Sequence, residues 1–87
     1  MPEAAVTLLN PTGLHARPAK VFAQAAAATA AKVTLSKSGR EVNGKSVLSV
    51  LTLDCHQGDE ILIRTEGEGA DVALEDLVRL VQSGLGE

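Results

Sequence analysis

The sequence predicts an α+β domain, an open-faced sandwich in which three helices cover one face of a four-stranded antiparallel sheet. Apolar residues switch between a period of two and a period near 3.6, which gives the element order βαββαβα. Helices follow the first and third strands, and a hairpin joins the second and third. Inserting the fourth strand between the first and second makes all neighbours antiparallel, in sheet order 1-4-2-3. The 87 residues fit one domain, 1–87.

The first half of the chain begins with a weakly alternating segment, Glu3–Leu9, which we expect to form a strand. The turn over residues 10–13 follows from its Asn, Pro and Gly. Alanine, the residue with the highest helix propensity, dominates the next segment, so a helix is predicted over Ala16–Ala31. Pro18 fits inside its first turn because the N–H groups there have no intrahelical acceptor.

The second half repeats the change from strand to helix. A cleanly alternating segment and its hairpin partner are followed by a short apolar helix, a strand centred on Ile-Leu-Ile and an amphipathic helix. These elements are predicted over Lys32–Lys37, Arg40–Asn43, Val47–Leu53, Glu60–Glu66 and Ala70–Ser83. Ser46 suits the N-cap of the short helix, and Gly84 suits the end of the last one.

Composition limits the function classes. The net charge of −3, the pI of about 5.3 and the lack of Trp and Tyr argue against a nucleic-acid surface. Cys55 has no cysteine with which to form an internal disulfide, which is typical of a reducing compartment. The sequence contains neither an apolar run of about 18 residues nor an N-terminal signal pattern, so we expect no membrane insertion and a cytoplasmic protein. Cys55 and His56 are adjacent and poorly spaced for a metal, so no metal or cofactor is expected.

His15 and Arg17 carry the chemistry that the sequence indicates. They lie between a Gly-containing turn and the start of the predicted helix. A neutral imidazole is a nucleophile that can accept a phosphoryl group, and the positive end of a helix dipole favours the neutral ring. After transfer, the backbone N–H groups near Ala16 and Arg17 and the guanidinium of Arg17 are expected to bind phosphate oxygens. A solvated histidine in a turn remains the simpler alternative for the residue taken alone.

A family resemblance follows from two segments. Residues 13–19, Gly-Leu-His-Ala-Arg-Pro-Ala, and residues 43–47, Asn-Gly-Lys-Ser-Val, resemble the HPr family, the histidine phosphocarriers of the bacterial phosphoenolpyruvate:sugar phosphotransferase system. The resemblance covers nearly the whole chain and implies the same element order. It implies that His15 accepts phosphate at Nδ1 from phospho-Enzyme I, with help from Arg17, and passes it to IIA domains of sugar permeases. The chain is then a relay carrier and not an enzyme, and we expect a monomer.

The short helix adds a second candidate region. By the same resemblance, Ser46 matches a serine that an HPr kinase/phosphorylase phosphorylates in Gram-positive members, whose product acts with a catabolite-control transcription factor. The ordinary interpretation of Ser46 is an N-cap, and the two roles are compatible. Val50 and Leu53 are the better core candidates of this helix. Some of Val47, Leu48 and Leu51 are therefore expected to form an exposed partner-binding patch, with burial beneath a loop as the alternative.

Departures from the family pattern leave other functions open. Many HPr chains have Gly at the position of Asp54, and the Cys55-His56 pair is not part of the pattern. In having Asp at position 54, the chain resembles the nitrogen-related branch of the family, whose members feed regulatory phosphorelays. Residues 43–46 instead favour the sugar-transport branch. A different class is a purely regulatory binding module that uses Ser46 and the apolar patch, with His15 inert. A small phosphatase of the acylphosphatase kind needs an Arg and Asn cluster that the sequence does not supply.

Overall fold

The computed structural model describes residues 2–86, so Met1 and Glu87 of the predicted domain lie outside the described residues. The described residues form four strands and three helices, in the predicted order βαββαβα. The strands are β1 (Glu3–Thr7), β2 (Lys32–Lys37), β3 (Arg40–Asn43) and β4 (Glu60–Glu66). The helices are α1 (Ala16–Ala27), α2 (Val47–Leu51) and α3 (Ala70–Gln82).

The sheet has the order β1-β4-β2-β3, and each neighbouring pair is antiparallel, which confirms the predicted 1-4-2-3 topology. The last strand in the chain therefore lies inside the sheet. Ile61 pairs with Val6 of β1, and Ile63 pairs with Leu35 of β2. These apolar residues of β4 point to the covered face, because they alternate with more exposed neighbours along the strand.

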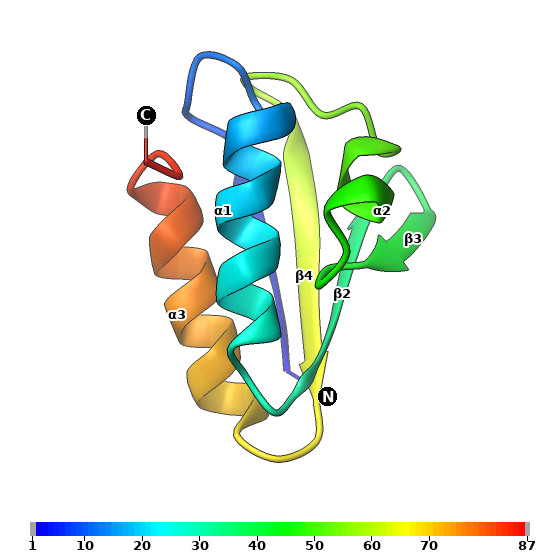
Figure 1. Ribbon diagram of the computed structural model, residues 1–87, viewed down its shortest axis with the longest axis vertical. Helices are drawn as coiled ribbons and strands as arrows, with labels where there is room; N and C mark the ends of the chain where they lie inside the picture. Colours follow the sequence, from blue (N-terminus) through cyan, green and yellow to red (C-terminus); the bar gives the residue numbers. More distant parts are fainter. Residues whose placement is uncertain (1, 87) are drawn as a thin grey trace.

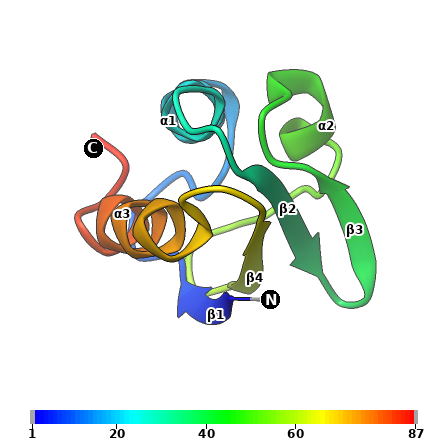
Figure 2. The ribbon, with the colours of Figure 1, turned by 90° about the horizontal axis from the view of Figure 1, so that it is seen from below.

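The three helices cover one face of the sheet and leave the other face open (Figures 1 and 2). Phe22 of α1 and Leu77 of α3 are fully buried against the strands. The open face carries charge instead: Arg64 of β4 forms ion pairs with Glu3 and Glu41 at 3.3 and 3.1 Å. Apolar burial on a single face therefore holds the helices and the sheet together.

Helix α1 ends at Ala27, four residues before the predicted end at Ala31. The Thr29 hydroxyl donates to the carbonyl of Ala26 at 2.9 Å, and Lys45 donates from Nζ to the carbonyl of Thr29 at 2.9 Å. These contacts turn the chain out of the helix so that Ala31 is fully buried ahead of β2. The alanine run therefore overstates the helix, because propensity does not specify where the chain must turn.

Three other elements, α2, β1 and α3, also end before the residues predicted from the sequence. Helix α2 ends at Leu51 and not at Leu53; the side chain of Arg40 donates to the carbonyl of Thr52 at 3.0 Å, just beyond the last helical residue. Strand β1 ends at Thr7 and not at Leu9, although Leu8 still exchanges backbone hydrogen bonds with residues 58 and 59. Helix α3 ends one residue early, before Ser83. Within residues 2–86, the helices are too short and too polar to cross a membrane.

Candidate functional site

His15 is the N-cap of α1 and lies at the boundary between a tight loop and the helix. Its backbone is extended, with φ −84° and ψ −167°, and its carbonyl accepts the first helical hydrogen bond from the N–H of Ala19 at 2.8 Å. The His15 side chain is exposed, and within the described part of the chain it makes no capping hydrogen bond to the helix. The imidazole is therefore held at the helix start by the backbone while its nitrogens remain accessible.

The first turn of α1 presents positive charge to this imidazole. Ala16 and Arg17 are exposed, and their N–H groups precede the first intrahelical bond. Pro18 has no N–H to satisfy and is buried, so it anchors the turn. The first turn contains no acidic residue to offset the helix dipole. The structure thus brings together His15, Ala16 and Arg17 in the arrangement that can receive an anionic group.

A glycine fixes the loop that leads to His15. Gly13 has φ +63°, and an added Cβ would lie 2.4 Å from the carbonyl oxygen of Cys55. The Asn10 amide donates to the Gly13 carbonyl, and the buried Leu14 donates its N–H to Cys55 at 3.0 Å. The loop before α1 is therefore packed directly on the loop between α2 and β4, two segments that also meet in Figure 1.

This packing brings an unexpected residue to the site. The ring of His56 lies edge-on to the ring of His15, with 5.5 Å between the centroids and an interplanar angle of 60°. The sequence suggests His56 only as a metal ligand beside Cys55, a role that the poor spacing argues against, and predicts no role for it at the His15 site. No local spacing signals the contact, because it arises from pairing of two loops far apart in the sequence. The buried Cys55 thiol points into the core, and burial raises its pKa.

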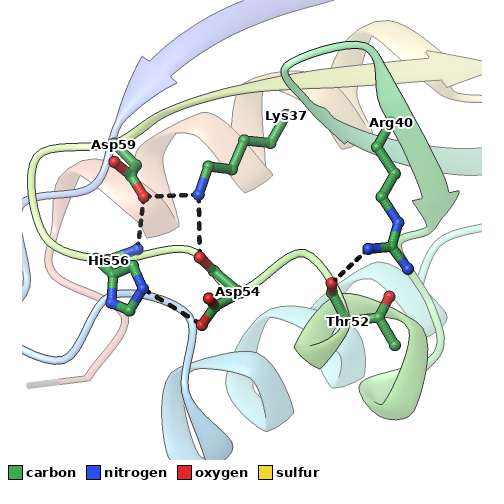
Figure 3. A network of polar contacts seen from close by, with 6 residues as sticks. All are labelled: Lys37, Arg40, Thr52, Asp54, His56 and Asp59. Carbon is green, nitrogen blue, oxygen red and sulfur yellow. Dashed lines mark hydrogen bonds and ion pairs between the residues drawn. The ribbon is translucent and has the colours of Figure 1, made fainter.

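His56 belongs to a polar network that extends to β2 (Figure 3). The His56 backbone N–H donates to the Asp59 carboxylate at 2.8 Å, and that carboxylate forms an ion pair with Lys37 at 2.9 Å. The backbone hydrogen bond from His56, followed by the Lys37 contact, lowers the pKa of Asp59. The same contact with Asp59 raises the pKa of Lys37. The His56 ring itself meets Asp54, with Nε2 3.3 Å from Oδ1.

Ser46 and the short helix form the second candidate region. The Ser46 hydroxyl accepts a hydrogen bond from the N–H of Ser49 at 3.3 Å, which confirms its N-cap geometry. Val50 and Leu53 are buried, in agreement with the sequence prediction. Leu48 is 77% exposed, whereas Val47 and Leu51 are half-buried against the core. The apolar patch is therefore centred on Leu48 and supported by its two neighbours.

Helix α2 lies beside α1 on the covered side of the sheet in both views (Figures 1 and 2), so the two candidate regions belong to adjacent elements. Within residues 2–86, the structure shows no cluster of three His, Cys, Asp or Glu residues arranged for a metal ion.

The fold and the sequence together define a phosphocarrier protein. A family model described as "PTS HPr component phosphorylation site" matches residues 2–83. This chain belongs to the HPr family of the phosphotransferase system.

Individual relatives agree with this assignment. The phosphocarrier protein HPr of Streptomyces coelicolor is 50% identical over 76 residues, which cover 86% of this chain and 82% of the relative. The crystal structure of HPr-C-His from Thermoanaerobacter tengcongensis has a TM-score of 0.96 at 36% identity, with 100% and 98% of the two chains covered. An HPr from Bacillus anthracis gives 0.90 at 38% identity, with 93% and 96% covered.

Replacing Gly13 by Ala tests the contact between the two loops. We expect Gly13→Ala to lower the free energy of unfolding by about 2 kcal/mol or more, because it adds a steric clash with Cys55 to the cost of a positive φ. Gly39→Ala is the matched control: Gly39 has φ +84°, but its added Cβ would meet no described atom within 4 Å. Urea denaturation of both variants separates the two costs. Equal destabilisation would contradict a steric role for the loop contact.

Proposed function

We propose that this chain relays a phosphoryl group on His15, taking it from phospho-Enzyme I and delivering it to IIA domains of sugar permeases. The observation that carries the proposal is the exposed imidazole at the N-cap of α1, directly before the first-turn N–H groups of the helix and the exposed residue Arg17. Membership of the HPr family supports the donor and the acceptors. The chain acts as a carrier and not as an enzyme with its own turnover, and it works as a cytoplasmic monomer without a cofactor.

The transfer needs a neutral His15 ring. Its nitrogen lone pair, at Nδ1 by family resemblance, attacks phosphorus; the N–P bond forms while the bond from phosphorus to the donor breaks, and that electron pair leaves with the donor. The N–H groups of Ala16 and Arg17 and the guanidinium of Arg17 bind the oxygens that carry negative charge. Delivery to the acceptor is the same step in reverse. Because His15 lies on the surface, both partners reach the phosphorus directly.

Replacing His15 and Arg17 tests the relay. Incubation with phosphoenolpyruvate and catalytic Enzyme I should give an acid-labile, base-stable phosphate adduct that His15→Ala abolishes. Arg17→Ala should slow the transfer about ten-fold without unfolding the domain, since it removes a charge-assisted contact. Lys20→Ala is the control, because Lys20 is another exposed cation of α1. Absence of the adduct, or an adduct that survives His15→Ala, would exclude this function; equal rates for Arg17→Ala and Lys20→Ala would exclude Arg17.

We further propose that Val47, Leu48 and Leu51 form the docking patch for Enzyme I and the IIA domains. Leu48 has the most exposed side chain of the three, and a large apolar side chain on the helix beside the phosphorylation site is typical of a partner-binding surface. Exposure also means that truncating Leu48 removes little from the core of this domain.

Leu48→Ala should raise the KM for transfer from Enzyme I about five-fold or more, the size of an interface contact of about 1 kcal/mol. The free energy of unfolding should change by less than about 0.5 kcal/mol. Val72→Ala is the matched control, because Val72 is 64% exposed but lies in the first turn of α3. That end of α3 is at the opposite end of the domain from the start of α1 (Figure 1). Transfer kinetics that respond equally to both variants would argue against the patch.

Ser46 is proposed as a regulatory site for an HPr kinase/phosphorylase, with the modified chain recognised by a catabolite-control transcription factor. Its hydroxyl is half-buried and serves as the α2 N-cap, so phosphorylation would replace a neutral cap by a dianion beside the docking patch. That charge would hinder an acidic partner and favour a basic one.

Incubation with ATP and the kinase should label the wild-type chain and Ser49→Ala, but not Ser46→Ala. Ser49→Ala is an informative control, since it keeps the backbone N–H that donates to Ser46. Loss of the cap in Ser46→Ala should also cost about 1 kcal/mol of stability, measured by urea denaturation. Label on Ser46→Ala would place the modified residue elsewhere.

A further inference from the structure

Two imidazoles meet at the start of α1, and the relay described above uses one of them. The contact between His15 and His56, 5.5 Å between ring centroids, is set by backbone packing of two loops. Leu14 donates its N–H to the Cys55 carbonyl at 3.0 Å, one residue from each histidine. Gly13 approaches the same loop with no room for a Cβ. The two rings are therefore neighbours by construction, although both side chains are exposed.

Asp54 orients the His56 ring. Its carboxylate Oδ1 lies 3.3 Å from His56 Nε2, and its backbone has φ +51°, in the left-handed region that few residues other than Gly, Asn and Asp adopt at low cost. The backbone of His56 is held in place as well. Its backbone N–H donates to the carboxylate of Asp59, which forms an ion pair with Lys37 (Figure 3). Lys37 also donates to the Asp54 carbonyl at 3.0 Å.

This orientation decides where His56 holds its protons. A carboxylate opposite Nε2 favours the proton on that nitrogen, so in the neutral ring Nδ1 carries a lone pair. When the ring is protonated, Nε2–H faces Asp54 and Nδ1–H becomes a second donor. The charged and titratable groups around His56 are Asp54 and Asp59 on its own loop, Lys37 on β2 and the His15 ring at the N-cap of α1.

We propose that His56, in its protonated form, contacts the phosphoryl group carried by His15 and protects it from water. The inference rests on the proposed function of His15. A phosphoryl group extends beyond the His15 ring, so rotation of two exposed side chains already in contact brings its oxygens to His56. The contact would be charge-assisted, between an imidazolium donor and a phosphate acceptor. His56 exchanges no covalent bond in the relay.

Protection follows from the chemistry of hydrolysis. Water attacks phosphorus, the N–P bond breaks, its electron pair returns to the His15 ring, and inorganic phosphate leaves. The step is faster when the phosphorylated ring first takes up a proton, because a neutral imidazole is then the leaving group. A cation beside that ring opposes the uptake of a second positive charge. His56 should therefore slow hydrolysis at pH values where an imidazole is protonated, and not above them.

The experiment follows the lifetime of the phosphorylated full-length chain after Enzyme I is removed, at pH 6 and pH 8. At pH 6 the wild-type phosphate should persist about two- to five-fold longer than that of His56→Gln, the range expected for a partly exposed ion pair. At pH 8 the two half-lives should converge. His56→Lys, which is charged at both pH values, should outlast the wild type at pH 8.

Asp54→Asn is the matched variant for orientation, because Asn tolerates a positive φ but carries no charge. It should bring the pH 6 half-life toward that of His56→Gln; a wild-type half-life would overturn the role of Asp54. Equal half-lives of the wild type and His56→Gln at pH 6, or a ratio that does not change with pH, would overturn the contact with the phosphoryl group. Failure of the wild type to become phosphorylated would instead exclude the proposed function.

Discussion

The close packing of the loop before α1 on the loop between α2 and β4 is the constraint on which the candidate site depends. Gly13 approaches the Cys55 carbonyl too closely for any side chain, and Leu14 bonds to the same carbonyl at 3.0 Å. This contact sets where α1 begins, and so where His15 and the first N–H groups of the helix point. It also ties the site to β4, one of the two inner strands of the sheet, because the backbone hydrogen bond from Leu8 to Asp59 continues the β1–β4 pairing beyond the end of β1.

The His15 imidazole is accessible because its side chain does not cap the helix. His15 begins the helix through its backbone carbonyl, so the imidazole is left out of the capping interaction that Ser, Thr or Asp would make at the same position. Ser46 shows the opposite use of an N-cap: its hydroxyl is engaged with Ser49 and stabilises α2. Two helices on one face of the sheet thus begin in different ways, one with an exposed imidazole that does not cap the helix and one with a satisfied cap.

Local patterns in the sequence predicted most of the fold. Alternation defined the strands, and the direction of each connection defined the sheet order, which the structure confirms. The Ser46 cap and the burial of Val50 also followed from local spacing. The end of α1 did not, because an unbroken alanine run continues past Ala27 while the turn depends on Thr29 and Lys45. His56 was missed for a related reason: its place beside His15 is a product of tertiary packing, which periodicity does not encode.

The left-handed backbone at Asp54 limits which chemical groups the fold can place beside His56. Only Gly, Asn and Asp occupy that conformation at low cost, so the position offers three states: no side chain, a neutral amide or a negative charge. A single substitution moves between them with little disturbance of the loop. The backbone conformation therefore restricts the charge beside His56 to a few alternatives. Evolution can change that charge by one substitution at position 54 without altering the rest of the domain.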